Sequence, residues 1–329
     1  LSSPFYLFSA QVSSSPACWS QPGGTAHNRS WHHRLLRQED EDYNGTDCEG
    51  DHLSKVSVTL LICLCGLVGN GAVLWFLGSH VRRNPTTTYV FNLAVADFTF
   101  LLSIAVAVVI FYSSESLCHR LASRDVTTAV NITILFSFTA SVYLLTAFSA
   151  TTSLSLLPSS HCPCHHSWGF SGVLCALLWA LSFLLTLTLY LRPVALIIFV
   201  LSYLLSVLTM MVSGLTLLAR LLCSSRQYPP KMLSVVVLLG VYFFPFFTAD
   251  FGYWLLLRLI DLSVFVFNTS LPLACVNSTI KPVIYFLVGC CGKNFTFSVR
   301  VAFQRALENA SEPPNRGKTP RENTVGTTV

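Results

Sequence analysis

Two ionisable side chains stand inside apolar stretches of the chain, where a charge is costly. Asp97 ends the string Asn92-Leu-Ala-Val-Ala-Asp97, and Lys281 precedes Pro282 much further along. A buried carboxylate must be protonated or find a cation, and a buried ammonium needs an acceptor. We predict that Lys281 pairs with Asp97 if their segments touch, so that an internal ion pair replaces a bound metal cation. The alternative is that Lys281 extends toward the inner headgroups.

A third polar residue, Asn70, follows Gly69 within another apolar stretch. Its amide is a candidate for orienting Asp97. The structural alternative is a hydrogen bond that only joins two helices, and the two roles are compatible. In either case a polar side chain inside a membrane span marks a candidate functional site.

Pro245 lies in the aromatic run Phe243–Phe247. Proline removes a backbone hydrogen bond, so we predict a bend there that serves as a pivot between the two halves of a helix. Asp250 follows toward the outer end of the same stretch. It is a candidate for binding a basic ligand group, or alternatively lies in interfacial water.

The sequence contains none of the enzyme motifs for zinc hydrolysis, phosphate binding or serine nucleophiles. The string His161–His166 gathers Cys and His side chains. Six consecutive residues on a short loop close a tetrahedral zinc site poorly, so we predict no metal and no cofactor. No run of basic residues with interleaved aromatics indicates nucleic-acid binding.

Composition indicates the element that must position these residues. Hydrophobic residues make up 53% of the 329-residue chain and charged residues only 11%, against about 25% charge in soluble domains. Since a helical span needs roughly 20 apolar residues, we predict an all-α membrane protein with a seven-transmembrane helix bundle. The predicted spans are Val56–Leu77, Thr86–Phe111, Thr127–Leu157, Trp168–Tyr190, Val194–Leu218, Met232–Leu257 and Leu262–Val288.

The junction between the fourth and fifth spans is the least certain part of this topology. Only Leu191, Arg192 and Pro193 separate two long apolar runs. Arg192 is costly at mid-bilayer and Pro193 disfavours a continuous helix, so we predict a tight helical hairpin. If the hairpin is absent, the number of spans falls.

The bundle, residues 56–289, divides the chain. Residues 1–55 are predicted to be an extracellular, disordered segment, glycosylated at Asn28 and Asn44, and residues 309–329 a disordered cytoplasmic tail. The excess of basic residues on the inner flanks favours a multi-pass topology with the N-terminus outside. The inner residues are Arg82, Arg83, Arg220, Arg226, Lys231, Lys293, Arg300 and Arg305, and the outer ones Lys55, Arg120, Arg124, Arg192 and Arg258.

Residues 290–308 alternate basic and apolar side chains, which fits a short amphipathic helix on the inner leaflet or, alternatively, a membrane-adjacent tail without fixed shape. Cys290 and Cys291 are candidate palmitoylation sites, with unmodified thiols as the alternative. The C-terminal Thr327–Val329 is a candidate ligand for a PDZ protein.

Several strings resemble those of rhodopsin-like (class A) G-protein-coupled receptors, and more specifically those of the Mas-related family, over about Val56 to Leu307. The general strings are Gly69-Asn70, Asn92-Leu-Ala-x-Ala-Asp97, Pro245 and Pro282-x-x-Tyr285. The specific strings are Leu67-Val-Gly-Asn-Gly-Ala-Val-Leu-Trp-Phe76, Arg82-Arg-Asn-Pro85, Val173-Leu-Cys-Ala-Leu-Leu-Trp-Ala-Leu-Ser182, Lys281-Pro-Val-Ile-Tyr-Phe-Leu-Val-Gly289 and Phe303-Gln-Arg-Ala-Leu307.

The resemblance implies a plasma-membrane receptor for a peptide or small basic agonist, acting on a heterotrimeric G protein. It also implies a polar network of Asn70, Asp97, Lys281 and Tyr285. The G-protein side would be formed by Thr151, Thr152, Arg220, Arg226 and Lys231.

The chain departs from the family's pattern at the inner end of the third span. There the family carries a Glu-Arg pair, and this chain has Thr151 and Thr152. The loop after the fourth span, with its paired Cys, is almost absent. We therefore expect impaired or atypical coupling. The alternative is a non-signalling, receptor-like membrane partner or a degenerate receptor. A transporter is disfavoured, because the sequence has no internal repeat.

Overall fold

The computed structural model describes residues 32–80, 84–112, 124–155, 168–192, 195–223, 232–257, 270–290, 298, 301–303 and 306. Within the helices, it leaves out the side chains of 32–53, 55, 80, 111–112, 124–125, 127, 168, 232, 246, 249–257 and 270.

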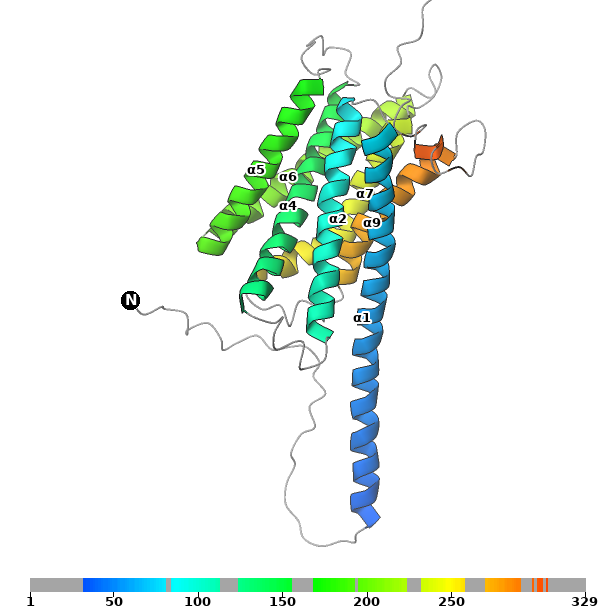
Figure 1. The fold of residues 1–329 in the computed structure, drawn as a ribbon, viewed down its shortest axis with the longest axis vertical. Coiled ribbons are helices and arrows are strands. Elements are labelled where there is room, and N and C mark those ends of the chain that lie inside the picture. The colour runs from blue at the N-terminus through cyan, green and yellow to red at the C-terminus, as the bar shows by residue number, and fades with distance from the viewer. Residues whose placement is uncertain are drawn as a thin grey trace, which may run out of the picture. The chain divides into compact units, whose positions relative to one another are not determined.

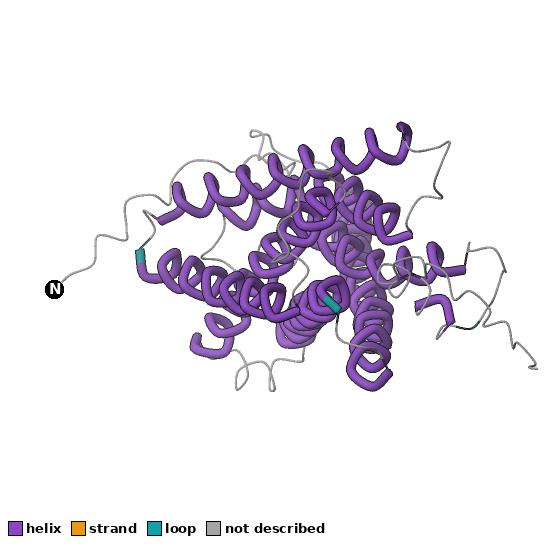
Figure 2. Tube along the Cα trace, turned by 90° about the horizontal axis from the view of Figure 1, so that it is seen from above, coloured by secondary structure: helices purple, strands orange, loops and turns teal. Residues whose placement is uncertain are grey.

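Long helices make up the described part of the chain, and no strand occurs in it (Figures 1 and 2). In chain order they are α1 (His32–His80), α2 (Pro85–Tyr112), α4 (Arg124–Ser155), α5 (Trp168–Leu191), α6 (Leu196–Cys223), α7 (Met232–Leu257) and α9 (Ser270–Cys290). The predicted all-α fold class is therefore confirmed.

Six of these helices are long and apolar enough to cross a bilayer, counting only described residues. Their apolar stretches are Val56–Ser79, Pro85–Ile110, Thr128–Ser155, Gly169–Leu191, Leu196–Cys223 and Leu271–Cys290. In α7 the described side chains form a shorter apolar stretch, Leu233–Pro245. The helices thus correspond to the seven predicted spans, and the chain is a multi-pass membrane protein.

The helix boundaries follow from local chemistry. Pro85 occupies the first position of α2, where its missing N–H costs nothing. The backbone N–H of Asn84 donates to Thr87 Oγ1 at 2.8 Å, and that hydroxyl donates back to the Asn84 carbonyl at 2.9 Å. Because the first turn of a helix lacks partners within the helix, these bonds stabilise the start of α2.

The chain separates into two compact units, Leu1–Gly50 and Asp51–Val329. The described backbone is helical from His32, whereas disorder was expected up to residue 55. Good helix formers such as Leu35, Leu36 and Glu39, with neither Gly nor Pro before Gly45, account for a helix there. The extracellular location and the glycosylation of residues 1–55 stay predictions.

The break between α5 and α6 falls where the sequence predicted it. The N–H of Arg192 donates to the Thr188 carbonyl at 2.8 Å, and the N–H of Ala195 donates to the Arg192 carbonyl at 2.9 Å. Arg192 is exposed, and the two helices contact each other. A helical hairpin therefore separates the fourth and fifth spans.

Helix α4 lies at the centre of the second unit, in contact with α2, α5, α6 and α7 (Figure 1). In an apolar 18-residue window of α4, 72% of the residues are buried, against 22% in the corresponding windows of α5 and α6. Leucines on those outer helices, such as Leu177 and Leu205, are mostly exposed. Since lipid is apolar, we expect these side chains to face the bilayer.

A short helical segment after α9 packs against the bundle. The N–H of Ala302 donates to the Ser298 carbonyl at 2.9 Å, and Ala302, Phe303 and Ala306 are buried. The rings of Phe303 and Phe76 of α1 have centroids 5.9 Å apart. The sequence predicted a short amphipathic helix or a tail without fixed shape here, and the described residues are helical, with Phe303 packed on protein.

Gly289 makes this packing depend on the absence of a side chain. A Cβ at Gly289 would lie 2.0 Å from the Ala302 carbonyl oxygen, a backbone atom that no rotamer change can move. We expect Gly289→Ala to displace the segment and lower the free energy of unfolding by about 1–3 kcal/mol. Thermal unfolding and hydrogen exchange over 298–306 measure this. Gly78→Ala, with no atom near its Cβ, is the matched control; equal effects of both substitutions would contradict the packing argument.

Candidate functional site

The centre of the bundle holds an ion pair between α2 and α9. Asp97 of α2 is fully buried, and Lys281 of α9 is 3% exposed. The ammonium Nζ of Lys281 lies 2.8 Å from both carboxylate oxygens of Asp97. Of the two arrangements considered for Lys281, the structure has the ion pair and not extension toward the headgroups.

Two hydroxyl groups complete the cluster. Ser141 of α4 donates to Asp97 Oδ1 at 2.8 Å and accepts a hydrogen bond from Lys281 Nζ at 3.0 Å. Ser278 of α9 donates to the same carboxylate oxygen at 3.0 Å. An ammonium has three hydrogens, and here they face three acceptor atoms. The cluster therefore supplies its own cation and joins α2, α4 and α9.

The buried faces of the helices place these groups. On α2, Asp97 shares the interior with Leu93, Phe100 and Leu101, each at most 1% exposed. Their spacing of three or four residues is that of one helical face. A lone charge on this face would be buried away from water, which is costly unless an oppositely charged group lies beside it.

Helix α1 reaches the cluster through Asn70. Its amide nitrogen donates to the Gly66 carbonyl at 3.0 Å and to the Ser278 carbonyl at 3.1 Å. Asn70 thus holds the backbone of Ser278, whose hydroxyl donates to Asp97. The role of Asn70 in orienting Asp97 stays a prediction. The next residue, Thr279, shares its hydroxyl hydrogen between the Cys275 carbonyl of its own helix at 2.8 Å and the Ile62 carbonyl of α1 at 3.3 Å. These bonds fix the register of α1 against α9.

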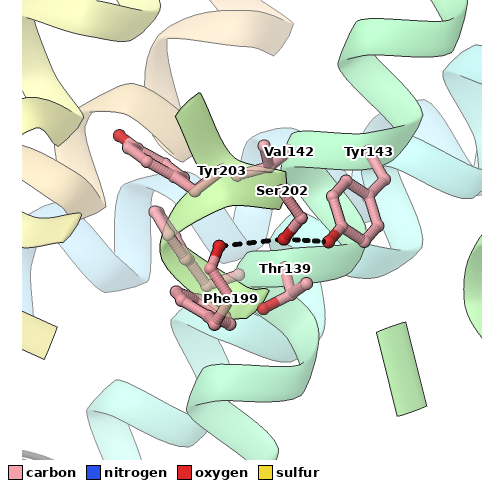
Figure 3. A pocket seen from close by; sticks show the side chains of 7 residues that line it. Thr139, Val142, Tyr143, Phe199, Ser202 and Tyr203 are labelled. Carbon is pink, nitrogen blue, oxygen red and sulfur yellow. Dashed lines mark hydrogen bonds between the residues drawn. The ribbon is translucent and has the colours of Figure 1, made fainter. Parts of the chain in front are cut away.

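A small pocket lies between α4 and α6 (Figure 3). The hydroxyl of Tyr143 donates to Ser202 Oγ at 2.8 Å, and Ser202 donates to the Phe199 carbonyl at 2.8 Å. The hydroxyl hydrogens of Tyr143 and Ser202 are thus already engaged in hydrogen bonds within the protein. What these side chains offer to a ligand is aromatic surface and hydrogen-bond acceptors. The space holds about one water molecule. It is lined by Phe138, Thr139, Val142, Tyr143, Phe199, Ser202 and Tyr203.

The last described turn of α4, up to Ser155, carries no charged residue. Thr152 is buried, and its hydroxyl donates to the Phe148 carbonyl at 2.7 Å. Thr151 donates to the Ala147 carbonyl at 2.8 Å. Both hydroxyls bond to the preceding turn of their own helix, the usual behaviour of threonine in a span. They do not provide the charge that a Glu-Arg pair would bring to this position.

The other predicted site residues are only partly described. Tyr285 is buried one turn beyond Lys281, and Pro245 lies inside α7. Asp250 belongs to α7, but its side chain lies outside the described residues, and its ligand role stays a prediction. Arg220 is exposed in the last turn of α6, while Arg226 and Lys231 lie outside the described residues.

The modification sites stay predictions. Asn28 is outside the described residues, and Asn44 lies in α1 with its side chain undescribed. Cys290 is 5% exposed at the end of α9, so an acyl chain there would have to displace packed side chains. This burial directs the palmitoylation hypothesis to Cys291, which the structure does not describe. The His161–His166 string also lies outside the described residues.

Sequence reasoning missed two contributions. It did not single out Ser141, because serines are common in spans and usually bond to their own helix. It also did not pair Trp179 of α5 with Asn92 of α2, whose Oδ1 accepts the indole N–H at 3.0 Å. The signal was available for Asn92, since an amide within an apolar stretch needs a partner.

The comparisons with known proteins agree with this architecture. No protein-family model matches the chain. It is 32% identical to the gorilla Mas-related G-protein coupled receptor member X2 over 309 residues, which cover 84% of this chain and 91% of the relative. It is 31% identical to the mouse member B4, covering 80% and 87%, and 31% identical to the human proto-oncogene Mas, covering 83% and 89%. The chain therefore belongs to the Mas-related G-protein-coupled receptor family.

Proposed function

We propose that this chain is a plasma-membrane receptor that binds a peptide or a small basic ligand and acts on heterotrimeric G proteins with impaired or atypical coupling. The observation that carries the proposal is the match to Mas-related receptors over most of the chain. The ion pair that joins three helices in the middle of the bundle supports it, because such a cluster holds a helix bundle in one arrangement.

The proposed orientation places the N-terminus outside the cell. The larger number of basic residues on the inner flanks supports it. The glycosylation acceptors Asn28 and Asn44 would then face the lumen during synthesis. A glycosidase-sensitive shift in the mass of the expressed protein, lost in the double variant Asn28→Gln/Asn44→Gln, tests this orientation.

A basic ligand suits the chemistry of the pocket between α4 and α6. Its aromatic rings favour cations, and its hydroxyl oxygens accept hydrogen bonds from N–H groups. Asp250 in α7 adds a candidate countercharge. Because the pocket holds about one water, a larger ligand requires α6 to move away from α4. Receptors of this kind work by ligand-biased populations of two bundle arrangements, and Pro245 is the proposed pivot of α7.

The proposed defect in coupling rests on Thr151 and Thr152. A hydroxyl bonded to its own helix offers neither a restraint between helices nor a cationic contact for a G protein. The receptor arrangement of the bundle would then persist while its output falls. The arrangement of the helices and the coupling to G proteins are therefore separate properties, and each can be tested by itself.

We expect the variant Thr151→Glu/Thr152→Arg to activate G proteins at least tenfold more than the parent chain at equal surface amounts. The inserted pair would restore charge at the inner end of α4, where a favourable contact of about 1.4 kcal/mol corresponds to tenfold. Nucleotide exchange on G proteins in membranes measures this. The swapped variant Thr151→Arg/Thr152→Glu has the same composition and should stay at parent level.

The alternative function is a non-signalling membrane partner of another receptor. The lost Glu-Arg pair favours it, and the complete polar cluster is compatible with it. If the variant and the parent both reach the surface and neither activates any G protein, this alternative replaces the receptor proposal. If neither reaches the surface, a degenerate receptor is the better interpretation.

A further inference from the structure

Two cysteine side chains from distant parts of the sequence meet between α1 and α9. The sulfur atoms of Cys63 and Cys275 lie 3.6 Å apart, with the thiol of Cys63 donating to the sulfur of Cys275. Both residues are fully buried, and both are free thiols. The ion-pair cluster and the pocket between α4 and α6 do not use them.

We propose that Cys63 and Cys275 form a reversible disulfide that links the first span to the seventh. A disulfide needs a sulfur separation of about 2.05 Å, so the two side chains must close about 1.5 Å. The helices already approach closely on the next turn, where a Cβ at Gly66 would lie 2.3 Å from Thr279 Oγ1. The two sulfur atoms can therefore come together by movement of their side chains, because the helices are already in contact.

The position of the pair suits an oxidant from the outer side. Cys63 follows the start of its apolar stretch by seven residues, or roughly 10 Å of helix, and Cys275 follows its start by four, or roughly 6 Å. In the proposed orientation both lie in the outer part of the membrane, next to the oxidising compartment. Only this supporting point rests on the proposed function.

The chemistry balances with hydrogen peroxide, a small uncharged oxidant. One thiol gives up two electrons to the peroxide, forming a sulfenic acid and releasing one water. The second sulfur then attacks the sulfenic sulfur, a sulfur–sulfur bond forms, and the hydroxyl leaves as a second water with the proton of the second thiol. A dithiol reductant reverses the product to two thiols.

The link would act on the polar cluster through α9. Cys275 lies one turn before Ser278 and Thr279, which bond to the carboxylate of Asp97 and to the carbonyl of Ile62. A covalent bond at Cys275 would hold this turn against α1. Movement of α9 along α1 would then be restricted in the oxidised form and free in the reduced form.

The test is cleavage of the chain between the two cysteines. A protease site inserted between Cys223 and Met232 separates a fragment with Cys63 from a fragment with Cys275. After peroxide treatment of the folded protein in membranes, we expect most of the two fragments to migrate together without reductant and apart with it. Mass spectrometry of the parent should show one linked peptide pair containing Cys63 and Cys275.

Variants identify the bond. In Cys63→Ala and in Cys275→Ala the fragments should separate, whereas Cys65→Ala should behave as the parent, because Cys65 is exposed on the same helix two residues away. Fragments that separate in the oxidised parent overturn the proposal. So does a link that persists in both alanine variants. Neither outcome depends on G-protein signalling, so the proposed function is judged separately.

Discussion

Replacing Lys281 by methionine is expected to lower the free energy of unfolding by about 3–5 kcal/mol, because it leaves the buried carboxylate of Asp97 without its cation. Methionine fills a similar volume, so the loss is electrostatic and not a cavity. The thermal unfolding midpoint of the purified protein in nanodiscs, together with its surface amount in cells, measures the effect. Asp97→Asn should be comparably unstable, since it leaves the ammonium unpaired.

The double variant Asp97→Leu/Lys281→Met distinguishes a pair from two independently important residues. Replacing both members of a buried ion pair by apolar side chains is often neutral, so the double variant should be about 3–5 kcal/mol more stable than Lys281→Met. Arg220→Met, which removes an exposed charge, should change stability by no more than about 0.5 kcal/mol. Additive losses in the double variant would contradict the ion-pair account.

Gly66→Ala is expected to lower the free energy of unfolding by about 1–3 kcal/mol and to disturb the ion-pair cluster. The added Cβ would lie 2.3 Å from Thr279 Oγ1 and 2.6 Å from Leu101 Cδ1, so these two side chains must shift or α1 must move. That movement would break the bond of Thr279 to Ile62 and weaken the hold of Asn70 on Ser278. Thermal unfolding and a loss of surface amount measure the effect.

Gly71→Ala is the matched control on the same helix. Its added Cβ would meet only Phe98 Cε2 at 3.8 Å, an ordinary contact. The two substitutions change helix propensity equally, so only packing separates them. Alanine in place of glycine favours the helix by about 1 kcal/mol, so the control should be neutral or stabilising. A Gly66→Ala variant as stable as Gly71→Ala would show that α1 and α9 are not in close contact there.

The sequence carried enough information for the helices and for the ion pair. Apolar runs of this length fit membrane-spanning helices and not a soluble fold. An Asp and a Lys within such runs have few partners besides each other. Arg192 and Pro193 were likewise sufficient to predict the break between α5 and α6. In each case one residue is so costly in its surroundings that few arrangements are left.

Other features depended on packing that the sequence does not express. Ser141 differs from its neighbours only in facing Asp97, and its spacing does not reveal that. Asn70 bonds to the Ser278 backbone rather than to a side chain, which no residue type signals. The contact of Phe303 with Phe76 depends on the close approach at Gly289, which the amphipathic pattern of residues 290–308 does not reveal.

We infer that the Lys281 ammonium takes the place of a bound cation beside Asp97. The most direct test of this inference is the unfolding midpoint of the parent chain as Na⁺ replaces N-methyl-D-glucamine at constant ionic strength. A bound ion stabilises the folded state in proportion to the logarithm of its concentration. The account predicts no change for the parent and a rise with Na⁺ for Lys281→Asn, which leaves Asp97 without its internal cation. A rise in the parent would contradict it.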